Sequence, residues 1–415
     1  MRKPPPRRLF SFWFGSLASA VLVVGLAGPA AAARPAPTER PGPGSLPVAA
    51  LDTALAGIHT AGMIGVFAEV RDGRATWRGA SGIADINTGR PVRPDYRHRV
   101  GSVTKTFVAA TVLQLVGEGR ISLDAPVRRY LPGLMPDDTV TVRMLLGHRS
   151  GIGTYDQVLF ATPELVEEHR NTTFRPRELA RVGLGMPATN PPGAAFSYSN
   201  TNYILAGLIV EQVTGRPAAE EVSRRILRPL GLRDTYFPGT DPRITGPHSR
   251  GYVPWYEGEL RDFTVYNMSW GYTAGELIST TADLDTFYRA LLGGRLLRPA
   301  QQADLVRFLP TGTGVGYGLG LLSLPLACGD AYGHDGQVFG YTTLSLHSPD
   351  GRRQVSVAQN ASHYQYAGDP ISAALFQFLD TALCGPQSTD AARTATARTL
   401  PLTPAPGLLP PTRLS

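Results

Sequence analysis

The side chains best suited to covalent chemistry in this sequence are a serine and a lysine three positions apart. They are Ser102 and Lys105, in the segment GSVTK at 101–105, and the only other lysine of the chain is Lys3. An arginine keeps its proton near neutral pH, whereas a desolvated lysine amine can become a neutral base. Outside the first residues of the chain, every other Lys or Arg position holds arginine. The single lysine therefore indicates that an amine able to lose its proton is needed at position 105.

The segment around this pair predicts a helix, because apolar residues between 104 and 118 recur every three or four positions. Positions i and i+3 share one face of a helix, so the amine of Lys105 could take the proton of the Ser102 hydroxyl. The positive end of the helix favours both a neutral lysine and a developing oxyanion. The alternative is a solvated lysine behind a serine that only caps the helix.

Two further segments carry side chains that could assist such a pair. In FSYSN at 196–200, Tyr198 offers a phenol as proton relay or base and Asn200 offers an amide. In YGHDG at 332–336, His334 stands among glycines that let a backbone approach a substrate. Taken singly, a core tyrosine, a turn asparagine and a structural histidine are the simpler interpretations. The presence of all three side chains in one sequence is not expected by chance.

These candidates need a scaffold, and the other periodicities of the sequence predict one. Helices are predicted at 48–61, 142–146, 203–214, 218–226, 281–292 and 371–383. Strands are predicted at 64–70, 75–79, 318–324, 340–347 and 353–360. Strands at both ends with helices between them imply an α/β (α+β) fold. Both ends of the chain then build one sheet, and a mostly helical subdomain is inserted at about 126–270.

Both ends of the chain differ in composition from the body at 48–385. Residues 1–33 combine basic residues, an apolar run and small residues, which predicts a secretory signal peptide; an uncleaved membrane anchor is the alternative. The proline-rich stretch 34–47 predicts a linker, and 386–415 a disordered tail. Removal of 1–33 lowers the net charge from +7 to +3, and no nucleic-acid module is present, so we expect no nucleic-acid partner. We expect a secreted protein, extracellular or associated with the cell wall, that keeps no membrane span.

The two cysteines of the chain are Cys328 and Cys384. Export would place both in an oxidising compartment, so one disulfide is expected, with two buried free thiols as the alternative. If they pair, the bond ties a strand before the last candidate motif to the final helix.

In this order, the motifs Ser-x-x-Lys, Tyr-Ser-Asn and His-x-Gly resemble the serine beta-lactamase and penicillin-binding hydrolase family. Within it the likeness is to the branch of class C beta-lactamases and soluble D-alanyl-D-alanine carboxypeptidases. Flanking segments agree with this resemblance: RVGS at 99–102, ISLD at 121–124, LLGHRSG at 145–151, YSNTNY at 198–203 and YGLG at 317–320. The likeness spans nearly the whole body, from Val48 to Cys384.

The resemblance implies a mixed, mainly antiparallel sheet flanked by helices, with the active site between the sheet and the helical subdomain. By it, Ser102 is the nucleophile and Lys105 its base or base partner. Tyr198 would pass the proton to the leaving group, and Asn200 would hold Lys105 and the substrate amide. His334 would stand where relatives carry lysine or histidine.

The same resemblance implies an oxyanion hole made by the backbone N–H groups of Ser102 and Gln337, with Gly336 and Asp335 beside the substrate. His148, in LLGHRSG, is predicted to be structural. No cofactor and no metal are expected, because neither His-Glu-x-x-His nor a cysteine and histidine cluster occurs in the sequence.

Departures from the family pattern bear on the substrate. Relatives that recognise a terminal carboxylate often have Thr or Ser where this chain has Asp335, and soluble peptidases carry basic residues where Leu322–Leu324 stand. The leading prediction is a monomeric D-alanyl-D-alanine carboxypeptidase or D-stereospecific peptidase acting on cell-wall peptides. The alternatives are an esterase or beta-lactamase of the same fold, or a penicillin-binding wall protein without turnover; in each case the partner is a small molecule or peptide.

Overall fold

The computed structural model of this chain describes residues 46–255, 259–364 and 368–385. The predicted signal peptide at 1–33, the tail at 386–415 and nearly all of the predicted linker at 34–47 lie outside these residues. Within the described part of the chain, no helix combines the length and the apolar character that a membrane crossing needs.

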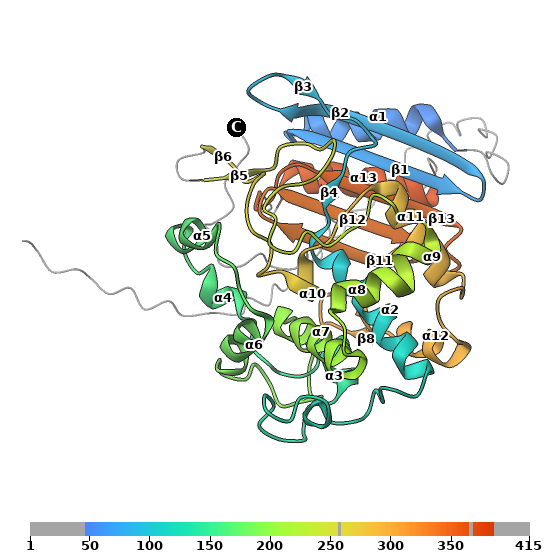
Figure 1. Ribbon diagram of the computed structural model, residues 1–415. Helices are drawn as coiled ribbons and strands as arrows, with labels where there is room; N and C mark the ends of the chain where they lie inside the picture. The colour runs from blue at the N-terminus through green and yellow to red at the C-terminus, as the bar shows by residue number, and fades with distance from the viewer. Residues whose placement is uncertain (1–45, 256–258, 365–367, 386–415) are drawn as a thin grey trace, which may run out of the picture. The chain divides into compact units, whose positions relative to one another are not determined.

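A nine-stranded antiparallel sheet forms the centre of the fold, in the order β3-β2-β1-β13-β12-β11-β10-β9-β8 (Figure 1). Its strands are β1 (Gly65–Asp72), β2 (Ala75–Asp85), β3 (Arg90–Pro91), β8 (Leu309–Pro310), β9 (Gly316–Tyr317), β10 (Leu322–Leu326), β11 (Gly329–Val338), β12 (Tyr341–His347) and β13 (Arg353–Gln359). The first strand pairs with the last, with Val66 opposite Gln359. The prediction that both ends of the chain build one sheet is therefore confirmed.

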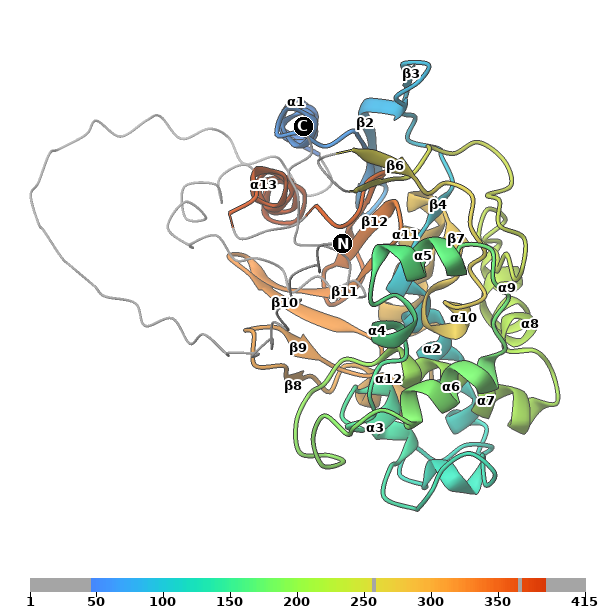
Figure 2. The same ribbon diagram turned by 90° about the vertical axis from the view of Figure 1, so that its left-hand side faces the viewer.

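Helices cover both faces of the sheet (Figure 2). On one face α1 (Val48–Thr60) and α13 (Pro370–Cys384) lie side by side, and their apolar residues join those of the central strands in one buried cluster. On the other face lie α2 (Thr104–Gly117) and α11 (Thr281–Leu292), in a second cluster with the helical region. Eleven of the fourteen residues of α2 are buried, so this helix is fixed by packing on all sides.

The helical region between the two parts of the sheet is made mostly of short elements. They are η1 (Gly101–Val103), η2 (Val127–Arg129), α3 (Val142–Leu146), α4 (Asp156–Leu159), α5 (Pro163–His169), α6 (Pro176–Leu184), α7 (Asn200–Thr214), α8 (Ala218–Val222), η3 (Ser223–Leu227), α9 (Arg228–Leu230), α10 (Tyr272–Gly275) and α12 (Pro299–Leu305). Four small strands accompany them: β4 (His98–Arg99), which pairs with β7 (Ile278–Ser279), and β5 (Tyr252–Pro254), which pairs with β6 (Leu260–Asp262).

The predicted strand at 318–324 is wrong at its start, because residues 318–321 lie between β9 and β10, and only 322–324 belong to a strand, β10. A turn separates the two strands, with the Gly318 N–H donating to the Leu321 carbonyl at 2.8 Å. Gly320 adopts a left-handed φ of 72°, a conformation that glycine reaches without steric cost. The apolar alternation of the segment gave no sign of this turn. The predicted helix at 218–226 is likewise split into α8 and the π turn η3.

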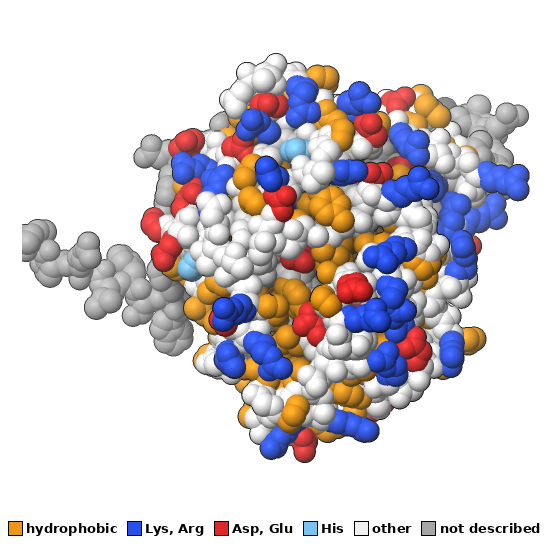
Figure 3. Space-filling model, viewed as in Figure 1, with side chains coloured by type: hydrophobic (Ala, Val, Ile, Leu, Met, Phe, Trp, Pro, Cys, Tyr) orange, Lys and Arg blue, Asp and Glu red, His pale blue; other side chains and the backbone are white. Residues whose placement is uncertain are grey.

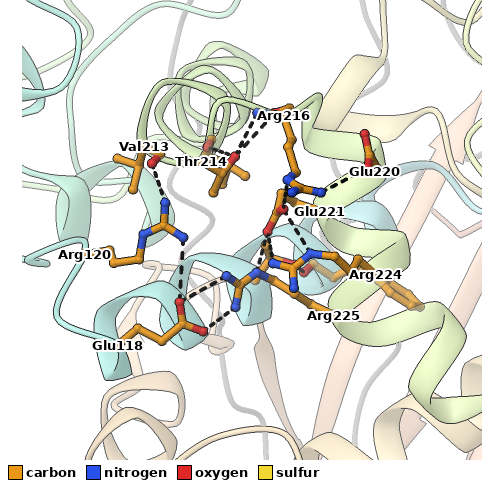
Figure 4. A network of polar contacts seen from close by, with 12 residues as sticks. Glu118, Arg120, Val213, Thr214, Arg216, Glu220, Glu221, Arg224 and Arg225 are labelled. Carbon is orange, nitrogen blue, oxygen red and sulfur yellow. Dashed lines mark hydrogen bonds and ion pairs between the residues drawn. The ribbon is translucent and has the colours of Figure 1, made fainter.

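A network of ion pairs fastens the end of α2 to the helical region (Figure 4). The Glu221 carboxylate, 1% exposed, binds Arg224 at 2.8 Å and Arg225 at 2.6 Å. Arg225 also binds Glu118, which follows directly after α2, at 2.5 Å. Elsewhere on the face drawn in Figure 3, arginine side chains are interspersed with acidic ones, in keeping with the scattered charge of the sequence.

One disulfide joins Cys328 to Cys384. Cys328 lies in the turn between β10 and β11, and Cys384 is the last residue of α13. The predicted pairing is confirmed, and the bond ties the strand that carries His334 to the final helix.

Candidate active site

The predicted serine and lysine meet where the turn η1 runs directly into α2. The Lys105 Nζ atom lies 2.8 Å from the Ser102 Oγ atom. Lys105 is completely buried, and Ser102 keeps 7% of its surface exposed. The structure therefore brings the two groups into hydrogen-bonding contact, as the spacing of three residues predicts.

Two carbonyl oxygens hold the Lys105 amine in addition to Ser102. Its Nζ atom lies 2.8 Å from the Asn200 Oδ1 atom and 2.7 Å from the Ala274 carbonyl. Both oxygens can only accept, so a neutral amine donates its two N–H groups to them and directs its lone pair at the Ser102 hydroxyl. This is the arrangement that a general base for Ser102 requires.

The surroundings of Lys105 favour its neutral amine over the ammonium form. Burial lowers the pKa of its ammonium group to about 7, against the opposing effect of the carboxylates of Asp156 and Asp335. A cation without hydration is disfavoured in the protein interior, which is the physical cause of the shift. Near neutral pH about half of the molecules would hold Lys105 in its neutral form.

Tyr198 approaches the Ser102 oxygen from the loop before α7. Its Oη–H donates to Ser102 Oγ at 2.7 Å, and its ring centroid lies 4.9 Å from Lys105 Nζ. Burial raises the pKa of the phenol well above its ordinary value, and the negative charge of Asp335 adds to this. The phenol therefore stays protonated, which favours a proton donor or relay over a base.

Asp156 is the carboxyl group that sequence reasoning missed. It begins α4, is 2% exposed and accepts hydrogen bonds from Thr154 Oγ1 and from the amide of Asn200. Burial raises its pKa. Asn200 is the first residue of α7, and its amide thus joins Asp156 to Lys105. Only the tertiary approach of α4 to α7 creates this contact, so no local pattern marked it.

The backbone of β11 passes close to the nucleophile, and two glycines permit the approach. A Cβ atom on Gly336 would lie 1.9 Å from the Val100 carbonyl and 2.9 Å from the Ser102 nitrogen. A Cβ atom on Gly101, whose φ is 52°, would lie 2.8 Å from the Gln337 nitrogen. Any larger residue would force the two segments apart. The two segments that carry the N–H groups of Ser102 and Gln337 thus lie in close contact.

His334 is completely buried on β11, and its hydrogen bonds are not to the nucleophile. Its Nδ1–H donates to the Asp335 carbonyl at 2.6 Å, so its Nε2 accepts from Tyr317 Oη at 2.9 Å. Among the described residues no hydrogen bond joins His334 to Ser102. The Asp335 side chain is 2% exposed, and its Oδ1 atom lies 3.4 Å from His334 Nδ1.

Similarity to known proteins agrees with this geometry. The model of a family described as Beta-lactamase matches residues 50–377. The esterase EstB of Burkholderia gladioli is 34% identical over 226 residues, which are 51% of this chain and 54% of the esterase. A D-aminopeptidase of Cereibacter sphaeroides is 29% identical over 357 residues, 80% of this chain and 64% of its own length.

A solved structure gives a more complete match. The D-stereospecific amidohydrolase from Streptomyces sp. is 37% identical with a TM-score of 0.74, and the match covers 81% of this chain and 99% of that one. The chain spans just over half of the esterase and just under two thirds of the D-aminopeptidase.

Proposed function

The chain belongs to the Beta-lactamase family, and on that premise we propose that it is a D-stereospecific serine hydrolase that cleaves amides and esters of D-amino acids through an acyl-enzyme at Ser102. The observation that carries the proposal is the hydrogen bonding of one oxygen, Ser102 Oγ, to both the Lys105 amine and the Tyr198 phenol. The Lys105 amine is suited to remove the proton of the Ser102 hydroxyl, and the Tyr198 phenol is suited to supply a proton to the leaving group.

In the proposed acylation, Lys105 Nζ takes the proton of Ser102 Oγ while the oxygen attacks the substrate carbonyl carbon. The negative charge on the carbonyl oxygen is held between the N–H groups of Ser102 and Gln337. When the bond to the leaving group breaks, the leaving atom takes the proton of Tyr198 Oη, and the Lys105 ammonium restores that proton. Water then attacks the acyl group with the same groups acting in reverse, which returns the enzyme to its starting state.

The charges near the base support a substrate that carries a free ammonium group. Asp156 and Asp335 are the two carboxylates whose charge acts on Lys105, and both are buried. A negative field attracts a cation and repels the terminal carboxylate of a D-alanyl-D-alanine peptide. The likeness to the D-aminopeptidase and to the D-stereospecific amidohydrolase points to the same substrate class.

An esterase is the second candidate, and the 34% identity to EstB favours it. An ester needs the same nucleophile and base, but its leaving group departs more easily than an amine. Stereospecific amide hydrolysis separates the two candidates, because only the first requires it.

The test compares D-alanine amide, L-alanine amide, N-acetyl-D-alanine amide and diacetyl-L-lysyl-D-alanyl-D-alanine, with p-nitrophenyl butyrate as a neutral ester. We expect D-alanine amide to have the highest kcat/KM of the four amide substrates and the Ser102→Ala variant to be inactive on all five compounds. Equal rates on the D and L amides would contradict the proposal. A preference for the lysyl tripeptide would support a carboxypeptidase, and turnover of the ester alone would support an esterase.

We further propose that the enzyme is exported, since residues 1–33 have the composition of a signal peptide. Protein recovered from the culture medium should begin shortly after this segment when its N-terminus is sequenced. Recovery of the full-length chain in the membrane fraction would favour an uncleaved anchor instead.

A further inference from the structure

His148 contacts the ring of Tyr198 and the backbone of both residues next to it in the chain. It follows α3, and it is completely buried. Its backbone carbonyl accepts the Ser197 N–H at 2.8 Å, and its ring Nδ1 accepts the Ser199 N–H at 3.2 Å. Its ring also lies against the Tyr198 ring, with centroids 4.1 Å apart and planes inclined by 32°. One residue therefore fixes both chain neighbours of the phenol and the phenol ring itself.

The contacts around the imidazole assign its protons. Ser150 Oγ–H donates to Asn202 Oδ1 at 2.6 Å, which turns the amide nitrogen of Asn202 toward His148 Nδ1 at 3.2 Å. Nδ1 thus faces two N–H donors, one from Asn202 and one from Ser199, and it must be an acceptor without a proton. Burial lowers the pKa of His148 well below its ordinary value. The ring is therefore neutral at working pH, with its proton on Nε2.

The backbone at His148 is held in an unfavourable conformation. Its φ is 53°, in the left-handed region that residues other than glycine seldom occupy. Backbone hydrogen bonds fasten the segment around it, because Gly193 N–H donates to the Arg149 carbonyl at 2.7 Å and Thr189 N–H to the Gly151 carbonyl at 2.8 Å. Such a conformation persists only where the surrounding contacts over-determine it.

We infer that His148 is a positioning residue for Tyr198, whose neutral imidazole keeps the phenol aimed at Ser102 Oγ so that it can protonate the leaving group. The inference rests on the proposed role of Tyr198 as proton donor and extends it to a residue that does not touch Ser102. A histidine that only stabilised the fold would affect every substrate alike.

Leaving groups of different basicity separate these two roles. Ethoxide must be protonated as it departs, whereas p-nitrophenolate leaves without help. Ethyl butyrate and p-nitrophenyl butyrate share one acyl group and one acylation site, so their comparison isolates proton donation. Neither ester has a stereocentre in its acyl part, so a failure of the proposed D-specificity does not affect this test.

The test uses two matched variants. His148→Phe keeps a ring against Tyr198 but removes the acceptor for the Ser199 N–H. His148→Asn offers Oδ1 in place of Nδ1 and tolerates a positive φ better than most residues. We expect His148→Phe to lower kcat/KM for ethyl butyrate roughly 100-fold, as the loss of a general acid does, but for p-nitrophenyl butyrate less than about fivefold. His148→Asn should stay within about fivefold of wild type on both esters.

An equal loss on both esters by His148→Phe, or no loss on either, would overturn the inference. Stoichiometric labelling of Ser102 by a fluorophosphonate shows that a variant is folded. Should His148→Phe not fold, Asn202→Asp takes its place, since its carboxylate draws the proton to Nδ1 and so removes the acceptor for the Ser199 N–H. This variant must show the same selective loss on ethyl butyrate; wild-type activity on that ester would equally overturn the inference.

Discussion

Replacing Asp156 by asparagine should shift the pH dependence of the reaction by an amount that follows from the structure. The Asn200 amide bridges the two charges: its Oδ1 lies 2.8 Å from Lys105 Nζ, and the same amide donates to Asp156. The charges are therefore about 6 to 8 Å apart, and at an effective dielectric constant of about 20 they attract each other by about 2 kcal/mol. That energy corresponds to a pKa change of about 1 to 2 units.

The sign of the shift follows from the role of the amine. Lys105 acts when neutral, so log kcat/KM should fall below its pKa of about 7. The Asp156 carboxylate stabilises the ammonium form; without that charge the pKa falls, and the acid limb of the profile moves to lower pH. Asparagine has the same shape and still accepts from Asn200, so the geometry is preserved.

The assay is kcat/KM for p-nitrophenyl butyrate between about pH 4.5 and 9, because a neutral ester does not itself interact with the charge that is removed. Asp335→Asn is the matched control and should shift the limb in the same direction by less, since Asp335 has the smaller effect on Lys105. A limb that stays in place or moves to higher pH in Asp156→Asn would refute the electrostatic account of the base.

Three further predictions concern the oxyanion backbone and the stability of the fold. Gly336→Ala places a Cβ 1.9 Å from the Val100 carbonyl and should lower kcat/KM for p-nitrophenyl butyrate roughly 100-fold while the circular dichroism spectrum is unchanged; near-wild-type activity would argue against a role for this strand. Glu221→Gln should lower the urea unfolding free energy by about 2 kcal/mol, because the buried Arg225 loses one of its two carboxylate partners and keeps only Glu118, and an unchanged unfolding free energy would contradict this. Replacing Cys328 and Cys384 together by serine opens a link between residues 56 apart and should cost about 4 kcal/mol in the same assay; equal stability with and without reductant in the wild type would show that the bond contributes nothing.

Much of the fold could be predicted because its signals are local. The apolar period of three to four marked α2 and α11, and period-two alternation marked β12 and β13 within one residue of their observed bounds. The missed boundaries have tertiary causes. β2 continues to Asp85 because it finds pairing partners in β1 and β3, and α7 begins at Asn200 because Thr154 and Gly153 hold its first turn.

The candidate site also combines contacts that local spacing in the sequence predicts with contacts that only the tertiary fold creates. Ser102 and Lys105 are three residues apart, so their meeting follows from helix geometry alone. The Ala274 carbonyl that binds Lys105 carries no sequence signal, because every residue has one. Asp156 reaches the site only through the packing of α4 against the start of α7, and the proton arrangement of His148 depends on side chains about fifty positions away.

Labelling with a fluorophosphonate, followed by peptide mapping, tests the central claim most directly. The account predicts one label per chain, on Ser102, at a rate that falls below about pH 7 in the wild type and by at least about 100-fold in Lys105→Arg, since a guanidinium cannot accept the proton. A label on any other residue, or labelling of Lys105→Arg at the wild-type rate, would contradict it.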